Sequence, residues 1–261
     1  ICAGKSTIAE YLVKHQGFKK LSLNRTASEL ADQNNSKFSL LDGESIFENV
    51  YDLLDFVTKH WRERWVTTDI FDQNTLETFL RRPFFIFISV DAPISLRWNR
   101  WQARHKQKDD GEDLSLEHFI EKSDEHLYGP GSASGQPLIS RATFRLLNTS
   151  SNLAHLYATL GKLDLTNEDR LRPNWDQYFM QLASLAAQRS NCMKRRVGCV
   201  IVREKRVIST GYNGTPRGLK NCADGGCKRC NEGLGSGIGL ATCLCIHAEE
   251  NALLEAGRDR I

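Results

Sequence analysis

The last third of the chain alternates between helical and strand-like hydrophobic periods. An apolar stripe at helical spacing indicates a helix with Pro173 in its first turn; the stripe consists of Trp175, Tyr178, Phe179, Leu182 and Leu185. Two short runs, Val197–Val202 and Arg206–Gly211, flank a charged turn and predict a β-hairpin. Ala and Leu then recur at helical spacing from His247 to Gly257, which is a suitable C-cap.

The first two thirds of the chain mix helical patterns with continuous apolar runs. Ile8–Val13 and Leu116–Leu127 are typical of helices. The uninterrupted run Phe84–Val90 predicts a strand in a buried parallel sheet, because both faces of such a strand are covered. A second run, Leu146–Leu153, leads into an amphipathic helix through Leu156, Leu160 and Leu163. The pattern as a whole predicts an α/β protein.

The 261-residue length is compatible with two domains, each able to bury a core. We place the first domain at residues 1–165 and the second at 173–261. The segment 166–172 between them is polar and ends before a proline, which is typical of a linker.

Composition changes this picture little. The chain is 40% hydrophobic and 26% charged with a net charge of +3, values of an ordinary globular protein. Its longest apolar run is too short to cross a bilayer, so no membrane association is expected. No basic groove studded with aromatic residues is visible, so nucleic acid is not an expected partner. A mildly basic surface suits anionic nucleotides, although it is equally compatible with an unremarkable surface.

Cysteine usage points to metal or reduced thiols. Five of the eight cysteines fall within one short segment, and we identify them as candidate zinc ligands: Cys222, Cys227, Cys230, Cys243 and Cys245. The intervening glycine-rich insertion has few apolar residues, so a second, structural zinc held by four of the five would stabilise it. The alternative is a set of reduced thiols packed together. Both alternatives favour a cytoplasmic location, with a nuclear one also compatible.

His247 and Glu249 carry the sharpest chemical signal. They form a His-x-Glu pattern at the start of a predicted helix. An imidazole at that position can ligate Zn²⁺, and a carboxylate two residues later can move protons without being a ligand. The pattern alone is weak, because many surface helices begin with such residues.

The surrounding residues strengthen this signal. From Arg172 to Ile261 the chain contains, in order, RSNC, VGCVIV, GYNGTPRG, CxxC and HAEENALLEAGR. In these motifs the chain closely resembles the deoxycytidylate (dCMP) deaminases of the fungal type. The resemblance implies a cytidine-deaminase-like α/β sandwich that hydrolyses dCMP to dUMP with a catalytic Zn²⁺ on His247 and with Glu249 as the proton carrier. It further implies a homo-oligomer with dCTP and dTTP as effectors, working in pyrimidine deoxynucleotide metabolism to supply dTTP.

Substrate recognition can be placed on three further residues. By the resemblance, Asn213 lies at the substrate sugar; the alternative is a turn asparagine. Arg195 and Arg196 have the guanidinium groups that suit the dCMP phosphate, and a solvated basic turn is equally compatible with them.

One family feature is absent from the sequence. Its members complete the catalytic zinc site with P-C-x-x-C some tens of residues after the histidine, and this chain contains no such pattern up to Ile261. We therefore expect the two thiolates to lie beyond Ile261. The sequence predicts a chain truncated at both ends and inactive in isolation.

A phosphate-binding pattern opens the first domain, where Gly4, Lys5, Ser6 and Thr7 precede a predicted helix. This is the second half of a P-loop, in which backbone N–H groups and the lysine bind phosphates while the hydroxyl reaches Mg²⁺. Together with the later Val-Asp-Ala-Pro and Asn-x-Ser-x-x-Leu words, residues 1–165 resemble dephospho-CoA kinase and related P-loop nucleotide kinases. Arg97, Arg100 and Arg104 would then lie in the lid region, and Asp69 is the best carboxylate for a metal or acceptor.

The alternatives for this first domain stay open. It is either a nucleotide-binding module or a kinase-like fold kept for structure. The corresponding alternative for the whole chain is a nucleotide-binding regulatory module with an inactive deaminase remnant.

Overall fold

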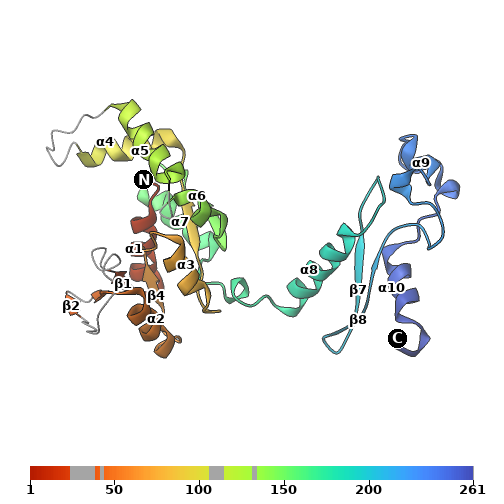
Figure 1. Ribbon diagram of the computed structural model, residues 1–261, viewed down its shortest axis with the longest axis horizontal. Helices are drawn as coiled ribbons and strands as arrows, with labels where there is room; N and C mark the ends of the chain where they lie inside the picture. The colour runs from red at the N-terminus through yellow and green to blue at the C-terminus, as the bar shows by residue number, and fades with distance from the viewer. Residues whose placement is uncertain (24–38, 42–43, 106–114, 131–133, 261) are drawn as a thin grey trace. The chain divides into compact units, whose positions relative to one another are not determined.

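The computed structural model describes residues 1–23, 39–41, 44–105, 115–130 and 134–260. It divides into two compact units, Ile1–Leu171 and Arg172–Ile261. Each unit mixes helices with short sheets (Figure 1). Within the described residues no helix combines the length and the apolar character that crossing a membrane requires.

The first unit builds two small sheets that contain parallel strand pairs. In the larger sheet the order is β2-β3-β1-β4, where β1 pairs in parallel with β3 and β4 while β2 pairs antiparallel with β3. These strands are β1 (Lys19–Leu23), β2 (Ser39–Leu41), β3 (Glu44–Phe47) and β4 (Trp65–Thr67). The second sheet is the parallel pair of β5 (Ile88–Asp91) and β6 (Phe144–Leu147).

Helices lie between β3 and β4, between β4 and β5, and between the parallel strands β5 and β6. The helices of the first unit are α1 (Lys5–Gln16), α2 (Val50–Lys59), α3 (Gln73–Leu80), α4 (Ile94–His105), α5 (Leu116–Tyr128), α6 (Gly135–Ser140) and α7 (Leu153–Leu163), and a short 3₁₀ turn, η2 (Glu168–Arg170), ends the unit. The helices predicted around Ile8, Leu116 and Leu156 are thereby confirmed as α1, α5 and α7.

Two apolar clusters form the core of the first unit. One joins α1, α7 and the β5–β6 pair and consists of Ile8, Tyr11, Leu12, Leu146, Leu156, Leu160 and Leu165. The other joins the larger sheet to α2 and α3 and consists of Leu21, Phe47, Leu53, Leu54, Val57 and Phe79. Burying side chains of this kind contributes about 1.5–3 kcal/mol each, so these clusters hold the helices against the strands.

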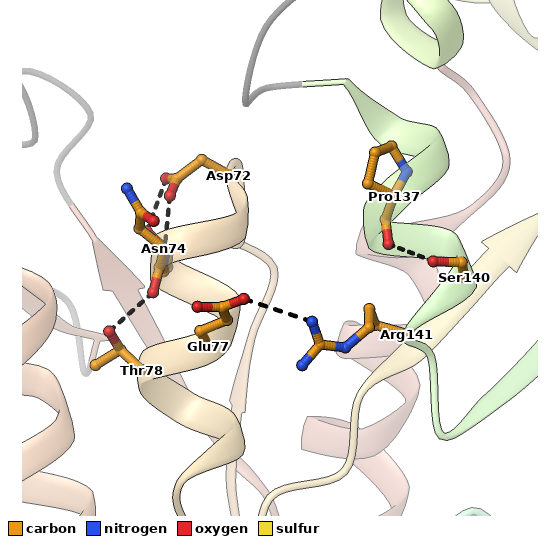
Figure 2. Close-up of polar contacts among 8 residues, drawn as sticks. Asp72, Asn74, Glu77, Thr78, Pro137, Ser140 and Arg141 are labelled. Atoms are coloured by element: carbon orange, nitrogen blue, oxygen red, sulfur yellow. Dashed lines mark hydrogen bonds and ion pairs between the residues drawn. The ribbon is translucent and has the colours of Figure 1, made fainter.

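Polar contacts tie α3 to α6 near their ends (Figure 2). The side chain of Asp72 caps α3 by accepting hydrogen bonds from the backbone N–H and the hydroxyl of Thr75, at 2.9 and 2.8 Å. Arg141, which follows α6, lies 3.5 Å from the carboxylate of Glu77 on α3. Both side chains of this ion pair are largely exposed, so it contributes little to stability beside the apolar clusters.

The second unit consists of an antiparallel hairpin between two helices (Figure 1). The hairpin joins β7 (Gly198–Arg203) to β8 (Arg206–Tyr212), which confirms the predicted strands. The helices are α8 (Trp175–Gln188) and α10 (Ala248–Ala256). A side chain at Gly198 would collide with the backbone of α8 and one at Gly211 with that of α10. Because Cys199 pairs with Gly211, these glycines face opposite sides of the hairpin, one toward each helix.

The insertion between β8 and α10 carries three short helical turns. They are η3 (Cys222–Asp224), α9 (Lys228–Asn231) and η4 (Leu240–Thr242). Another 3₁₀ turn, η5 (Arg258–Arg260), follows α10.

Two expectations about the elements were wrong. Pro173 does not lie in the first turn of α8: the helix starts at Trp175, because Asn174 accepts from the N–H of Gln177 and the Gln177 side chain bonds back to the Asn174 N–H. The predicted strand Phe84–Val90 is shorter than its apolar run, since the regular strand β5 begins at Ile88. Phe84 and Phe85 instead form a turn that packs on the second apolar cluster.

Candidate functional site

His247 and Glu249 lie together at the start of α10. His247 is the N-cap residue and Glu249 occupies the first helical turn, and both side chains are exposed. The carboxylate of Glu249 acts electrostatically on Cys199 of β7: burial and the Glu249 charge together raise the pKa of the Cys199 thiol. An accessible imidazole at the helix start is therefore followed two residues later by an accessible carboxylate, which lies near Cys199 of the hairpin.

Backbone contacts fix the start of α10 against the loop after β8. Gly214 and Ile246 form an antiparallel bridge, with the Ile246 N–H donating to the Gly214 carbonyl at 3.0 Å. On the first turns of α10, Asn251 donates through Nδ2 to the carbonyl of Tyr212 at 2.7 Å. These contacts hold residues 212–214 beside His247.

Asn213 lies between those two anchors and is half-buried. Its Oδ1 accepts from the Val197 N–H at 2.8 Å, and its Nδ2 donates to the carbonyl of Arg195 at 2.9 Å. The hydroxyl of Ser190 lies 2.7 Å from the Asn213 carbonyl and 2.8 Å from Oδ1 and donates to them. Asn213 thus holds Ser190, Arg195 and Val197 together through hydrogen bonds.

Arg195 and Arg196 are exposed at the turn that Asn213 holds. Within the described part of the chain neither guanidinium group has a hydrogen bond or ion pair. Two unpaired cations at a fixed backbone turn can recognise an anion.

A cluster of thiols lies at the base of the insertion. Cys222, Cys227 and Cys230 are buried, and their sulfur atoms all lie within 4.8 Å of one another. Four sulfurs bound tetrahedrally at about 2.3 Å from Zn²⁺ would lie roughly 3.8 Å apart, so this set fits a zinc ion. Three further thiols pack against it: Cys192, Cys243 and Cys245. We call these six residues the thiol cluster.

Proton affinities differ strongly within the thiol cluster. Burial and the neighbouring thiols raise the pKa of Cys245 to about 12 and that of Cys230 further still. For Cys227 burial acts the same way, but hydrogen bonds from the Cys230 N–H and from the thiols of Cys230, Cys243 and Cys222 prevail and lower its pKa. Thiolate-stabilising contacts therefore already exist at the centre of the cluster.

The structure adds one member to the predicted thiol set. Cys192 is half-buried in the segment after α8, and hydrogen bonds from Arg195, Lys194 and Cys230 outweigh burial and lower its pKa. Its long sequence separation from Cys222 hid this proximity, although its RSNC context was visible in the sequence. Among the described residues, His247 joins no group of three close metal-ligating atoms. The expectation that two catalytic thiolates lie beyond Ile261 and that the chain is inactive finds no support here, and zinc-competent thiols do lie within the described residues.

The first unit presents its own candidate site at the start of α1. Gly4 has a left-handed conformation with φ of 108°, and a side chain there would collide with the amide of Asn148. That amide, 3% exposed, donates to the carbonyl of Ala3 at 2.9 Å. Lys5 donates to the carbonyl of Thr68 at 2.8 Å, next to Asp69. Asn148 thus contacts the turn before α1 and holds its backbone by a hydrogen bond.

The residues expected near a lid have distinct contacts. Arg100 donates to the carbonyls of Cys2, Ala3 and Ser150, so it braces the turn before α1. Arg97 is 9% exposed and donates through Nε to the carbonyl of Ala92 at 3.0 Å. Asp69 is the second residue after β4, and its carboxylate accepts from the Leu23 N–H at 3.0 Å.

Comparison with known proteins adds family information to this geometry. The family model "cytidine and deoxycytidylate deaminase zinc-binding region" matches residues 173–261. The chain is 46% identical to the deoxycytidylate deaminase of Schizosaccharomyces pombe over 263 residues, covering 100% of this chain and 78% of that protein. It is 45% identical to the deoxycytidylate deaminase of Saccharomyces cerevisiae, covering 82% of this chain and 69% of that protein. The ComE operon protein 2 of Bacillus subtilis is 41% identical over 33% of this chain and 42% of its own length.

Proposed function

The chain belongs to the deoxycytidylate deaminase family, and we propose that it catalyses the hydrolytic deamination of dCMP to dUMP and ammonia. The observation that carries this proposal is the pair formed by His247 at the N-cap of α10 and Glu249 in its first turn, both exposed beside the loop 212–214. The product would enter pyrimidine deoxynucleotide metabolism toward dTTP.

Glu249 is the proton carrier in this proposal. Zn²⁺, with His247 as one ligand, would supply a Lewis acid that makes water acidic near neutral pH. Glu249 accepts the proton of the attacking water and passes it to the ring nitrogen of cytosine. It then takes the remaining proton of the hydroxyl added to the ring carbon and delivers it to the departing amine, so that water and dCMP give dUMP and ammonia in balance. Its exposed place in the first helical turn leaves it free to approach the substrate.

The phosphate and sugar of dCMP would be bound by the segment around Asn213. Arg195 and Arg196 supply charge-assisted donors for the 5′-phosphate, while the remaining N–H of Asn213 is available for the sugar. A second, structural Zn²⁺ would be held by Cys222, Cys227, Cys230 and one more member of the thiol cluster, which supports the insertion before His247.

Replacement of Glu249 by Gln tests the catalytic proposal. We expect the zinc-loaded Glu249→Gln protein to lose dUMP formation by about 10²–10⁴-fold while still binding zinc, because only proton transfer is removed. Glu250→Gln, on the same helical turn, is the matched control and should leave turnover within about twofold. Absence of dUMP formation by the wild-type protein, or retained turnover in Glu249→Gln, would contradict the proposal.

We further propose that the first unit binds a nucleotide phosphate at the start of α1. The N–H groups of the first turn, with Gly4, Lys5, Ser6 and Thr7, would bind phosphate oxygens, and the Ser6 hydroxyl and Asp69 would approach Mg²⁺. The observation favouring this second function is the bracing of the turn by Arg100 and Asn148, which presents Lys5 beside Asp69.

A titration with ATP and Mg²⁺ tests this second function. We expect saturable ATP binding that Lys5→Ala weakens at least about tenfold, since one charge-assisted contact is lost. Lys14→Ala, which removes an exposed lysine from the other end of α1, is the control. Equal ATP affinity in the wild type and Lys5→Ala would instead support a purely structural first unit.

A further inference from the structure

A buried serine connects the end of α8 to Asn213. Ser190 is 3% exposed, so its hydroxyl is inaccessible to a substrate. That hydroxyl donates to both oxygens of Asn213 and accepts the N–H of Cys192 at 3.2 Å. Ser190 can therefore influence a ligand only through the residues it holds.

Asn213 in turn fixes the backbone on both sides of Arg196. Its Oδ1 accepts the N–H of Val197 and its Nδ2 donates to the carbonyl of Arg195. The backbone adds a third link, since the Asn213 N–H donates to the Val197 carbonyl at 3.2 Å. The backbone that carries the two arginine side chains is thus held by Asn213.

Asn213 is also connected to the start of α10, where the proposed catalytic residues lie. Gly214, the next residue, pairs with Ile246, which immediately precedes His247. Asn213 therefore lies on a continuous covalent and hydrogen-bonded path between His247 and the Arg195–Arg196 turn.

We propose that the Ser190–Asn213 pair sets the preference for a 5′-monophosphate over the free nucleoside by holding the Arg195–Arg196 turn at a fixed distance from His247. Ser190 and Asn213 act here as positioning residues: they hold the turn, and the arginines bind the phosphate. The inference rests on the proposed dCMP activity and adds to it the residues that select the substrate class.

The test compares binding of dCMP and deoxycytidine in a Glu249→Gln background, where turnover is blocked. Isothermal titration of the zinc-loaded protein gives a dissociation constant for each ligand. We expect Ser190→Ala to raise the ratio of the dissociation constant of dCMP to that of deoxycytidine by about 3- to 10-fold, equivalent to about one hydrogen bond. A weaker sugar contact at Asn213 affects both ligands alike and cancels in this ratio. The ratio of the two constants is the readout, because general destabilisation changes both ligands alike.

Ser209→Ala is the matched control. Ser209 is also buried, and its hydroxyl donates to the carbonyl of Ala252 at 2.7 Å, away from the arginine turn. It should leave the ratio unchanged. In an Arg195→Gln/Arg196→Gln background, Ser190→Ala should have no further effect on the ratio, because the phosphate ligands are gone.

The outcomes separate the two proposals. If the protein prefers dCMP but Ser190→Ala changes the ratio no more than Ser209→Ala, the positioning role is wrong and the dCMP proposal stands. A protein without any preference for dCMP over deoxycytidine overturns phosphate recognition and the positioning role together. Since the arginines are exposed, their double variant reports on phosphate recognition even if Ser190→Ala fails to fold.

Discussion

The two units bury different chemical groups. In the first unit, aliphatic and aromatic side chains form two clusters between helices and parallel strands, with Leu21, Leu53 and Leu160 each about 1% exposed. In the described part of the second unit, the buried apolar side chains belong to small residues, namely Cys222, Cys227, Cys230, Ala248, Ala252 and Ala256. The helix α8 has no buried residue, although it carries an apolar stripe.

This difference shows where each unit obtains its stability. Large buried side chains contribute through transfer from water, and the first unit has many of them. Small alanines permit α10 to approach β8 closely, but they contribute little apolar area. In the described second unit, the thiol cluster is the other buried group that can contribute to stability. Three close thiols stabilise a fold far more with a bound metal than without one. The second unit is therefore expected to depend on zinc, and the first is not.

Removal of the metal should have the largest effect and should affect one unit only. In small zinc domains the free energy of zinc binding, about 10–16 kcal/mol, contributes directly to the free energy of folding. A chelator or Cys227→Ser should therefore unfold the insertion and much of the second unit. Hydrogen exchange resolved along the chain, with zinc content measured in parallel, checks this. Protection in residues 212–256 should fall, while protection in α1 and α7 is unchanged.

A substitution in the apolar core of the first unit tests the other half of the comparison between the two units. Leu160→Ala removes a fully buried side chain from the first cluster and should lower the stability of the first unit by about 2–5 kcal/mol. Zinc content should remain that of the wild type. Equal loss of protection in both units after chelation would show that their stabilities are coupled, against the comparison drawn above.

The sequence predicted the elements of the second unit well because its signals are local. The hairpin and α10 follow from short periodic runs, and His247 lies at the predicted helix start. The thiol cluster was only partly predictable, since Cys192 reaches it from a distant segment. No local pattern records such a contact.

The hydrogen bonds around Asn213 could likewise not be predicted from local sequence. A Tyr-Asn-Gly-Thr word predicts a turn or a ligand contact, whereas the bonds to Ser190, Arg195 and Val197 arise only when α8, β7 and β8 pack. In the first unit, hydrophobicity overpredicted β5, because Phe84 and Phe85 are buried by a turn rather than by a strand. There the apolar run predicts partial burial but not backbone conformation, whereas the stripe of α8 predicts the helix but not its burial.

Glycine substitutions should act in opposite directions in the two units. A Cβ at Gly211 would lie less than 3.0 Å from the backbone carbonyl of Ala248 and the amide of Ala252, so α10 would have to shift. We expect Gly211→Ala to destabilise the second unit by about 1–3 kcal/mol and to lower dCMP turnover with it. In α7, a Cβ at Gly161 meets only the Tyr11 hydroxyl at 3.7 Å.

Gly161→Ala should therefore stabilise the first unit by about 0.5–1 kcal/mol, the helical preference of alanine over glycine. Urea unfolding followed separately for each unit checks both variants. A neutral Gly211→Ala would mean that α10 can move away from the hairpin at no cost, and the close helix–strand contact would then not be what positions Glu249.

The smallest expected effect is an ion pair on the surface of the first unit. Lys19 donates to the carboxylate of Glu63 at 2.6 Å, and this hydrogen bond, with the charges of Lys19 and His60, lowers the pKa of the fully exposed Glu63. A carboxyl whose pKa is lower in the folded than in the unfolded state contributes stability above its unfolded value, near 4.5, and this contribution is lost as the pH falls through the folded pKa. Glu63→Gln should thus weaken the first unit slightly at pH 7 and less at pH 3. Urea midpoints at the two pH values measure the difference, and Lys19→Gln should reproduce it without adding to it in the double variant. A pH-independent loss would assign the effect to packing against Trp65, over which the Lys19 ammonium lies at 5.2 Å, rather than to charge.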